Sequence, residues 1–81
     1  LINSKTNHLM IDYTLNNRAD VSIFIINVSG QVIYQGFLGQ ILSGRHRFNI
    51  TTHLNSGIYI LKLISKTKKG SDIATKKFFI R

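Results

Sequence analysis

Side chains that could carry acid–base or metal chemistry are few in this sequence of 81 residues, which has three carboxylates, three histidines and no cysteine. A metal shell needs several such ligands close together, and acid–base catalysis needs a positioned pair of titratable groups. No two of the histidines have the spacing of a metal-binding pair. We therefore predict no catalytic residue, no metal site, no cofactor and no enzyme activity. The groups concerned are Asp12, Asp20, Asp72, His8, His46 and His53.

The excess of positive charge lies in the second half of the chain. The formal net charge is +8, and nine of the eleven lysines and arginines fall in residues 45–81. Interleaved with Tyr59, Phe78 and Phe79, they resemble the cationic stacking platform of proteins that bind single-stranded nucleic acid. Lysines also protect exposed strand edges from pairing with another sheet, and a basic surface can dock onto an acidic protein or lipid. We favour edge protection, because the lysines gather in a turn and a terminal strand, and we expect no nucleic-acid partner.

Alternating apolar residues predict strands along most of the chain. In residues 8–15 the alternate positions Leu9, Ile11, Tyr13 and Leu15 are apolar, and a period of two indicates a strand with one buried face. Gly36 and Gly39 bracket a short segment in which we expect a bulge or a change of sheet. The predicted strands span residues 8–15, 21–28, 31–35, 38–42, 45–51, 58–64 and 73–81.

Turn residues separate the predicted strands. Ser29-Gly30 predicts a hairpin with a two-residue loop. Seven short strands separated by turns at intervals of roughly 8–12 residues are typical of an antiparallel β-sandwich. No run approaches the ~18 apolar residues of a membrane-spanning helix, so we expect no membrane span. The chain opens at Leu1 without the pattern of a signal peptide, and we expect a single domain, residues 1–81, from a larger secreted protein.

Five segments in register resemble one known family, the C-terminal sorting domain (type A) of the type IX, or Por, secretion system of Gram-negative bacteria. The most recognisable is a Leu-x-x-Gly-x-Tyr motif before an apolar strand, and another is a Gly-x-His strand. Ser4 stands where the family usually has proline. The matching segments are Asn3–Ile11, Val21–Ile33, Ser43–Ile50, Leu54–Leu63 and Lys76–Arg81.

The resemblance implies an all-β, Ig-like antiparallel β-sandwich of about seven strands that works as an address label. Such a domain directs its cargo through the periplasm to the outer-membrane translocon, and the cargo is then secreted or held at the cell surface. The partners implied are type IX translocon components and a sortase-like peptidase that removes the domain. We expect the last two strands and their ends to be recognised. The residues expected to make up the sorting-signal motif are Gly44, Gly57, Tyr59, Lys76, Lys77 and Arg81.

Two alternatives accompany this interpretation. An Ig-like or fibronectin-like accessory module of a secreted protein, binding glycan or another protein, would have the same strand pattern. A small sandwich also has exposed edge strands, so two copies could pair through them, and an edge-strand dimer is the second alternative. The sequence does not identify the cargo, because a sorting label carries no information about the protein it labels.

Overall fold

The computed structural model describes residues 2–5 and 8–80, and the side chains of residues 8–80. This part of the chain is built from strands and contains no helix. The strands are β1 (Ile2–Lys5), β2 (His8–Leu15), β3 (Ala19–Asn27), β4 (Val32–Ile41), β5 (Gly44–Thr51), β6 (Gly57–Thr67) and β7 (Gly70–Ile80).

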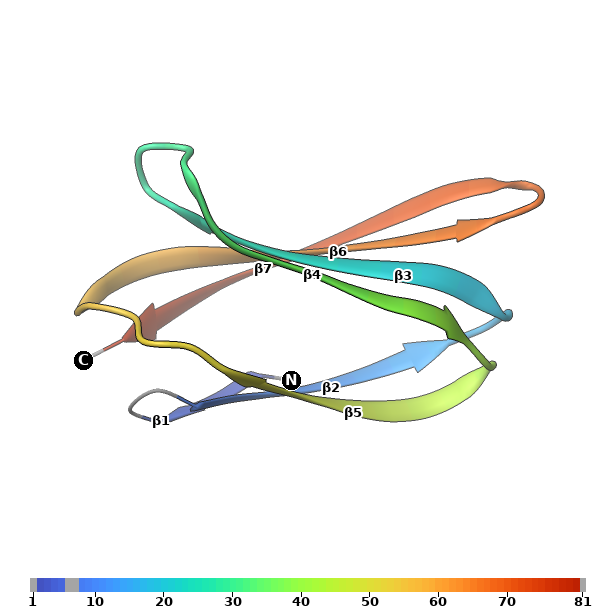
Figure 1. Ribbon diagram of the computed structural model, residues 1–81, viewed down its shortest axis with the longest axis horizontal. Coiled ribbons are helices and arrows are strands. Elements are labelled where there is room, and N and C mark those ends of the chain that lie inside the picture. The colour runs from blue at the N-terminus through green and yellow to red at the C-terminus, as the bar shows by residue number, and fades with distance from the viewer. Residues whose placement is uncertain (1, 6–7, 81) are drawn as a thin grey trace.

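The strands form two antiparallel sheets that pack face to face (Figure 1). One sheet has the order β1-β2-β5 and is the lower layer in the figure, and the other has the order β4-β3-β6-β7 and is the upper layer. In a constant-type immunoglobulin domain the fourth strand belongs to the sheet of the first, second and fifth strands. Here the fourth strand pairs with the third instead, which leaves three strands facing four. The prediction of an Ig-like antiparallel sandwich is confirmed.

The predicted number of strands agrees with the structure, but the predictions for β1 and β4 were wrong. Residues 31–35 and 38–42 were predicted as two strands, but a single strand, β4, runs from Val32 to Ile41. The predicted irregularity near Gly36 and Gly39 is a bulge: Gly39 lies opposite Val21 and Phe37 opposite Ser22, so Leu38 is the extra residue. A bulge bends a strand without ending its pairing.

Strand β1 was missed because its four residues, Ile-Asn-Ser-Lys, have no alternation of apolar side chains. It is held by backbone pairing with β2, in a register that sets Ile2 opposite Ile11 and Lys5 opposite His8. Backbone hydrogen bonds form with any residue but proline, and they leave no pattern in the sequence.

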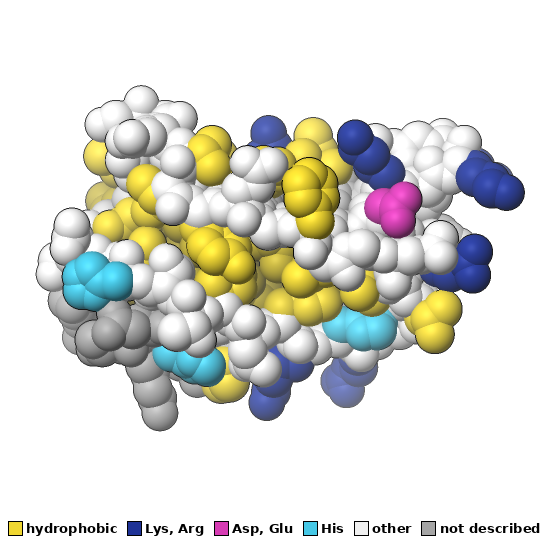
Figure 2. Space-filling view, viewed as in Figure 1, with side chains coloured by type: hydrophobic (Ala, Val, Ile, Leu, Met, Phe, Trp, Pro, Cys, Tyr) yellow, Lys and Arg dark blue, Asp and Glu magenta, His cyan; other side chains and the backbone are white. Residues whose placement is uncertain are grey.

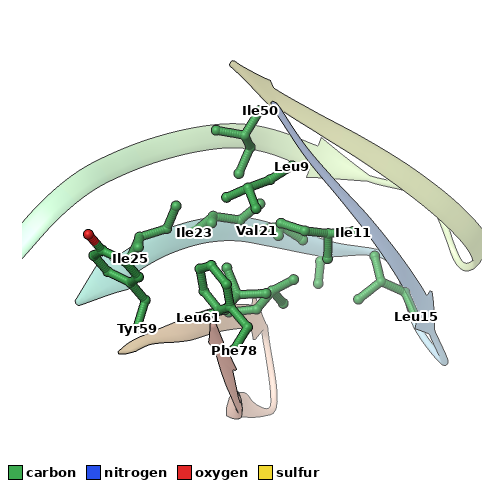
Figure 3. Packing of buried hydrophobic residues seen from close by; sticks show 12 residues of the cluster. Leu9, Ile11, Leu15, Val21, Ile23, Ile25, Ile50, Tyr59, Leu61 and Phe78 are labelled. Carbon is green, nitrogen blue, oxygen red and sulfur yellow. The ribbon is translucent and has the colours of Figure 1, made fainter. Parts of the chain in front are cut away.

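The core lies between the sheets and is formed by alternate side chains of both layers (Figure 3). On β2 and β3 most inward positions are fully buried, Tyr13 is partly buried, and no outward position is fully buried. Burial of a Val, Leu or Ile side chain stabilises the fold by about 1.5–3 kcal/mol relative to exposure. Since the chain has no disulfide, this layer is the main source of stability. The buried apolar residues are Leu9, Ile11, Leu15, Ala19, Val21, Ile23, Ile25, Ile50, Tyr59, Leu61, Leu63 and Phe78.

The β3–β4 hairpin has four residues between its strands, not the two predicted. Asn27 explains the longer loop. Its side-chain Oδ1 accepts hydrogen bonds from the backbone N–H of Ser29 and of Gln31, each at 3.0 Å. Its backbone N–H donates to the carbonyl of Gln31, also at 3.0 Å. An asparagine that bonds backbone groups further along the chain stabilises a turn.

Replacing Asn27 by alanine should lower the free energy of unfolding by about 1 kcal/mol, because two backbone N–H groups lose their acceptor. Urea unfolding followed by circular dichroism measures the change. The matched control is Ser29→Ala in the same loop, where the backbone N–H that donates to Asn27 is kept, and this variant should unfold like the unaltered chain. Equal stabilities of Asn27→Ala and Ser29→Ala would contradict this role for Asn27.

Candidate functional site

Tyr59 is a core residue whose side chain makes a hydrogen bond to the backbone. Its side chain is 7% exposed and stacks on Phe78 of the neighbouring strand, with ring centroids 5.7 Å apart and planes inclined by 28°. The phenolic O–H donates to the carbonyl of Asn55 at 2.7 Å. This bond ties the loop before β6 to the core, and the stack ties β6 to β7. Tyr59 therefore positions strands β6 and β7, and its side chain is not displayed at the surface.

Gly44 and Gly57 lie at opposite ends of the sandwich. Gly44 opens β5 opposite Leu15, and Gly57 opens β6 opposite Ile80. Their backbone φ angles are +120° and +155°, values that residues with a Cβ rarely adopt. Both glycines therefore allow the backbone to turn into the strand that begins there. The structure does not bring them together as one site.

Lys76 and Lys77 point to opposite sides of the edge strand β7. Lys76 pairs with Leu61, whose side chain faces the core, and it borders a cleft of ≈ 200 Å³ that is also lined by Ile11 and Tyr13. A charged residue pointing inward on an edge strand opposes pairing with another sheet. Lys77 pairs with Ile60 on the outer side, with its Nζ 5.8 Å from the ring centroid of Phe79. The remaining motif residue, Arg81, lies outside the described residues.

The outer surface of the four-stranded sheet combines apolar side chains with lysines. Outward side chains in the same row across the sheet are neighbours, because paired residues share a face. Exposure is high on the two edge strands, at 77% for Phe37, 59% for Ile73 and 59% for Phe79. Along the upper border of Figure 2, yellow apolar and dark-blue cationic side chains lie next to one another.

We call this surface the apolar–lysine face. By strand register and exposure it comprises Val32 and Phe37 of β4, Phe24 and Ile26 of β3, Ile58, Ile60, Lys62 and Ile64 of β6, and Ile73, Lys77 and Phe79 of β7.

The outer surface of the three-stranded sheet is polar by comparison. Its outward positions on β5 are Arg45, Arg47, Asn49 and Thr51. Arg47 donates from Nε to Oδ1 of Asp12 at 2.8 Å and from Nη2 to Oδ2 at 3.3 Å. These hydrogen bonds hold the pKa of Asp12 below its ordinary value. An exposed pair of this kind contributes little to stability. Of the two broad faces, the apolar–lysine face therefore exposes more large apolar side chains to water.

Within the described residues, no three His, Cys, Asp or Glu side chains are placed to hold a metal ion. The described residues also contain no helix that is long and apolar enough to cross a membrane.

The continuity of the apolar–lysine face was not predicted from the sequence. Residues 21–28 and 58–64 have apolar residues at outward as well as inward positions, and this is the signal that was available. Register turns these separate positions into one surface, because Ile26 pairs with Ile60 and Ile60 with Lys77.

Comparison with protein-family models matches residues 3–81 to the secretion system C-terminal sorting domain. No curated protein and no solved structure matches the chain significantly. The matched range contains both sheets and both broad faces.

Proposed function

This chain belongs to the family of secretion system C-terminal sorting domains of type IX secretion, and we propose that it is read, as a folded sandwich, by the outer-membrane translocon. The family makes it a sorting signal, and its cargo a secreted or cell-surface protein. The family match over residues 3–81 carries the proposal. The domain would pass through the periplasm with its cargo, and a sortase-like peptidase would remove it after translocation.

The proposal is supported by what the molecule displays. A label needs a stable scaffold and a distinctive surface, and this sandwich combines an apolar core with one outer surface rich in both apolar side chains and lysines. Gly44, Gly57 and Tyr59 act in it as scaffold residues. We propose Lys77 and the neighbouring outer positions of β6 and β7 as part of the recognised surface, and Lys76 as a guard of the β7 edge. We keep Arg81, which lies outside the described residues, as a proposed part of the signal through its positive charge.

The test is a fusion of residues 1–81 behind a reporter that carries its own periplasmic signal peptide, expressed in a host with a type IX system. We expect the reporter at the cell surface or in the medium, and in the periplasm of the same host without the translocon. The mass of the exported reporter tests cleavage: loss of about the mass of the domain supports the peptidase step, and a full-length exported fusion would refute that step while leaving sorting intact.

An accessory binding module is the second candidate function, and the exposed apolar–lysine face is compatible with it. The same fusion separates the two. A module that only binds glycan or protein leaves the reporter in the periplasm of both hosts.

A further inference from the structure

We propose that the apolar–lysine face docks onto a protein surface that is apolar and acidic, and that the domain is recognised through this contact. The proposal rests on the sorting function and names the chemistry of the partner. Exposed apolar patches beyond a few hundred Å² mark interaction sites in soluble proteins. Here three of the exposed side chains are phenylalanine or isoleucine on the two edge strands, each more than half exposed.

Two rows of mostly apolar side chains cross the outer surface of the sheet. In one row Phe37 of β4 leads through Ser22 and Ile64 to Ile73 of β7, as the pairing registers show. The other row runs Val32, Ile26, Ile60 and Lys77 by the same registers. Phe79 lies beside Ile58 at the end of the sheet.

A partly polar row separates these two rows. It runs from Gln35 through Phe24 and Lys62 to Thr75. Lys62 is half-buried on a central strand, so a partner that covers the face must supply a counter-charge at its middle.

This polar row argues for a protein over a lipid partner. Hydrocarbon would leave Gln35, Lys62 and Thr75 without hydrogen-bond partners in an apolar medium, which costs several kcal/mol for a charged group. A protein surface can place carboxylates and carbonyls opposite them, with apolar side chains on either side.

The distribution of charge argues against a second copy of the chain. Among the described residues, the carboxylate on this side of the sheet is Asp20 at its border, in register with Lys66. Asp12 lies on the other sheet, and Asp72 lines a cleft between the sheets with Tyr13 and Leu15. Face-to-face pairing of two copies would place Lys62 and Lys77 of both copies in one interface. Like charges at an interface select against that partner.

The experiment uses the reporter fusion in intact cells, with a photo-crosslinking phenylalanine analogue in place of Phe37 or Phe79 and, as a control, in place of Asn49 on the polar face. We expect crosslinks to one protein from Phe37 and Phe79, at peptides that carry Asp or Glu beside apolar residues, and none to that protein from Asn49.

The double variant Lys62→Glu, Lys77→Glu should reduce both the crosslink and the export rate at least about tenfold, since close charge pairs contribute more than 1.4 kcal/mol. The control Arg45→Glu, Lys68→Glu changes the net charge equally and should change neither.

Each other outcome overturns the proposal. Equal crosslinking from both faces shows that the apolar–lysine face is not selective. A crosslinked dimer identifies a second copy, and binding of the purified fusion to vesicles of phosphatidylcholine and phosphatidylglycerol that is lost in Lys62→Glu, Lys77→Glu identifies lipid. Normal export of this double variant, with an unchanged thermal midpoint, places recognition elsewhere and leaves the sorting function standing. Face-specific crosslinks in a fusion that is never exported would instead refute the sorting function and retain the docking site.

Discussion

Replacing Tyr59 by alanine should lower the free energy of unfolding by about 3–5 kcal/mol, the usual cost of deleting a buried aromatic ring. The ring is 7% exposed and stacks on Phe78 across the β6–β7 pair, so its removal would leave a cavity in the core. A domain of this size has a total stability on the order of 4–12 kcal/mol. The variant should therefore be largely unfolded or close to it, and we expect its fusion to remain in the periplasm.

The matched variant is Tyr59→Phe, which keeps the ring and removes the O–H that donates to Asn55. It should cost about 1 kcal/mol and leave export near normal. Urea unfolding of both variants, followed by circular dichroism, gives the two free energies. A Tyr59→Ala variant as stable as Tyr59→Phe would show that the ring does not support the core in the way that the packing implies.

Deleting residues 76–81 should trap the cargo in the periplasm while the cargo itself stays folded. The deletion removes the half of β7 that pairs with β6 from Gly57 to Leu61, together with the buried ring of Phe78. Tyr59 and Leu61 then lose the strand that covers them, and backbone groups of β6 lose their partners. We expect the remaining sandwich to be unfolded, because a strand edge and part of the core are lost together.

The matched control for the deletion keeps the strand and changes its charge: Lys76→Ser at full length. Because Lys76 points to the core side of the edge, this variant should fold and be exported like the unaltered fusion. Cell fractionation with the reporter activity of each fraction measures export, and activity in the periplasm shows that the cargo is folded. Export of the fusion that lacks residues 76–81 would contradict the requirement for β7.

Most of the strands could be predicted from the sequence, because burying one face of a strand makes every second residue apolar. Where inward residues are apolar and outward ones are mostly polar, as along β2 with Leu9, Ile11 and Leu15, the predicted strand and the observed strand coincide. β1 has no such pattern, and what the structure shows of it is its backbone pairing with β2. In β4 the glycines that mark a break in a sequence are part of a bulge that keeps the pairing.

The site was less accessible because it depends on register. Lys76 and Lys77 are neighbours in the sequence and were expected to act together, yet alternation sends them to opposite sides of the sheet. The outer surface depends on which strands lie side by side: Phe37 and Ile73 are distant in the sequence and share a row across β4, β3, β6 and β7. No local pattern contains that information.

The most direct test of the central claim is the fraction of reporter that external protease digests on intact cells expressing the fusion with residues 1–81. The sorting function predicts that most of the reporter is digested in a host with a working type IX translocon, and that it is protected in the same host without the translocon. Tyr59→Ala should resemble the host without the translocon, and Tyr59→Phe should resemble the unaltered fusion. Protection of the unaltered reporter in both hosts would contradict the claim that this domain is a sorting signal.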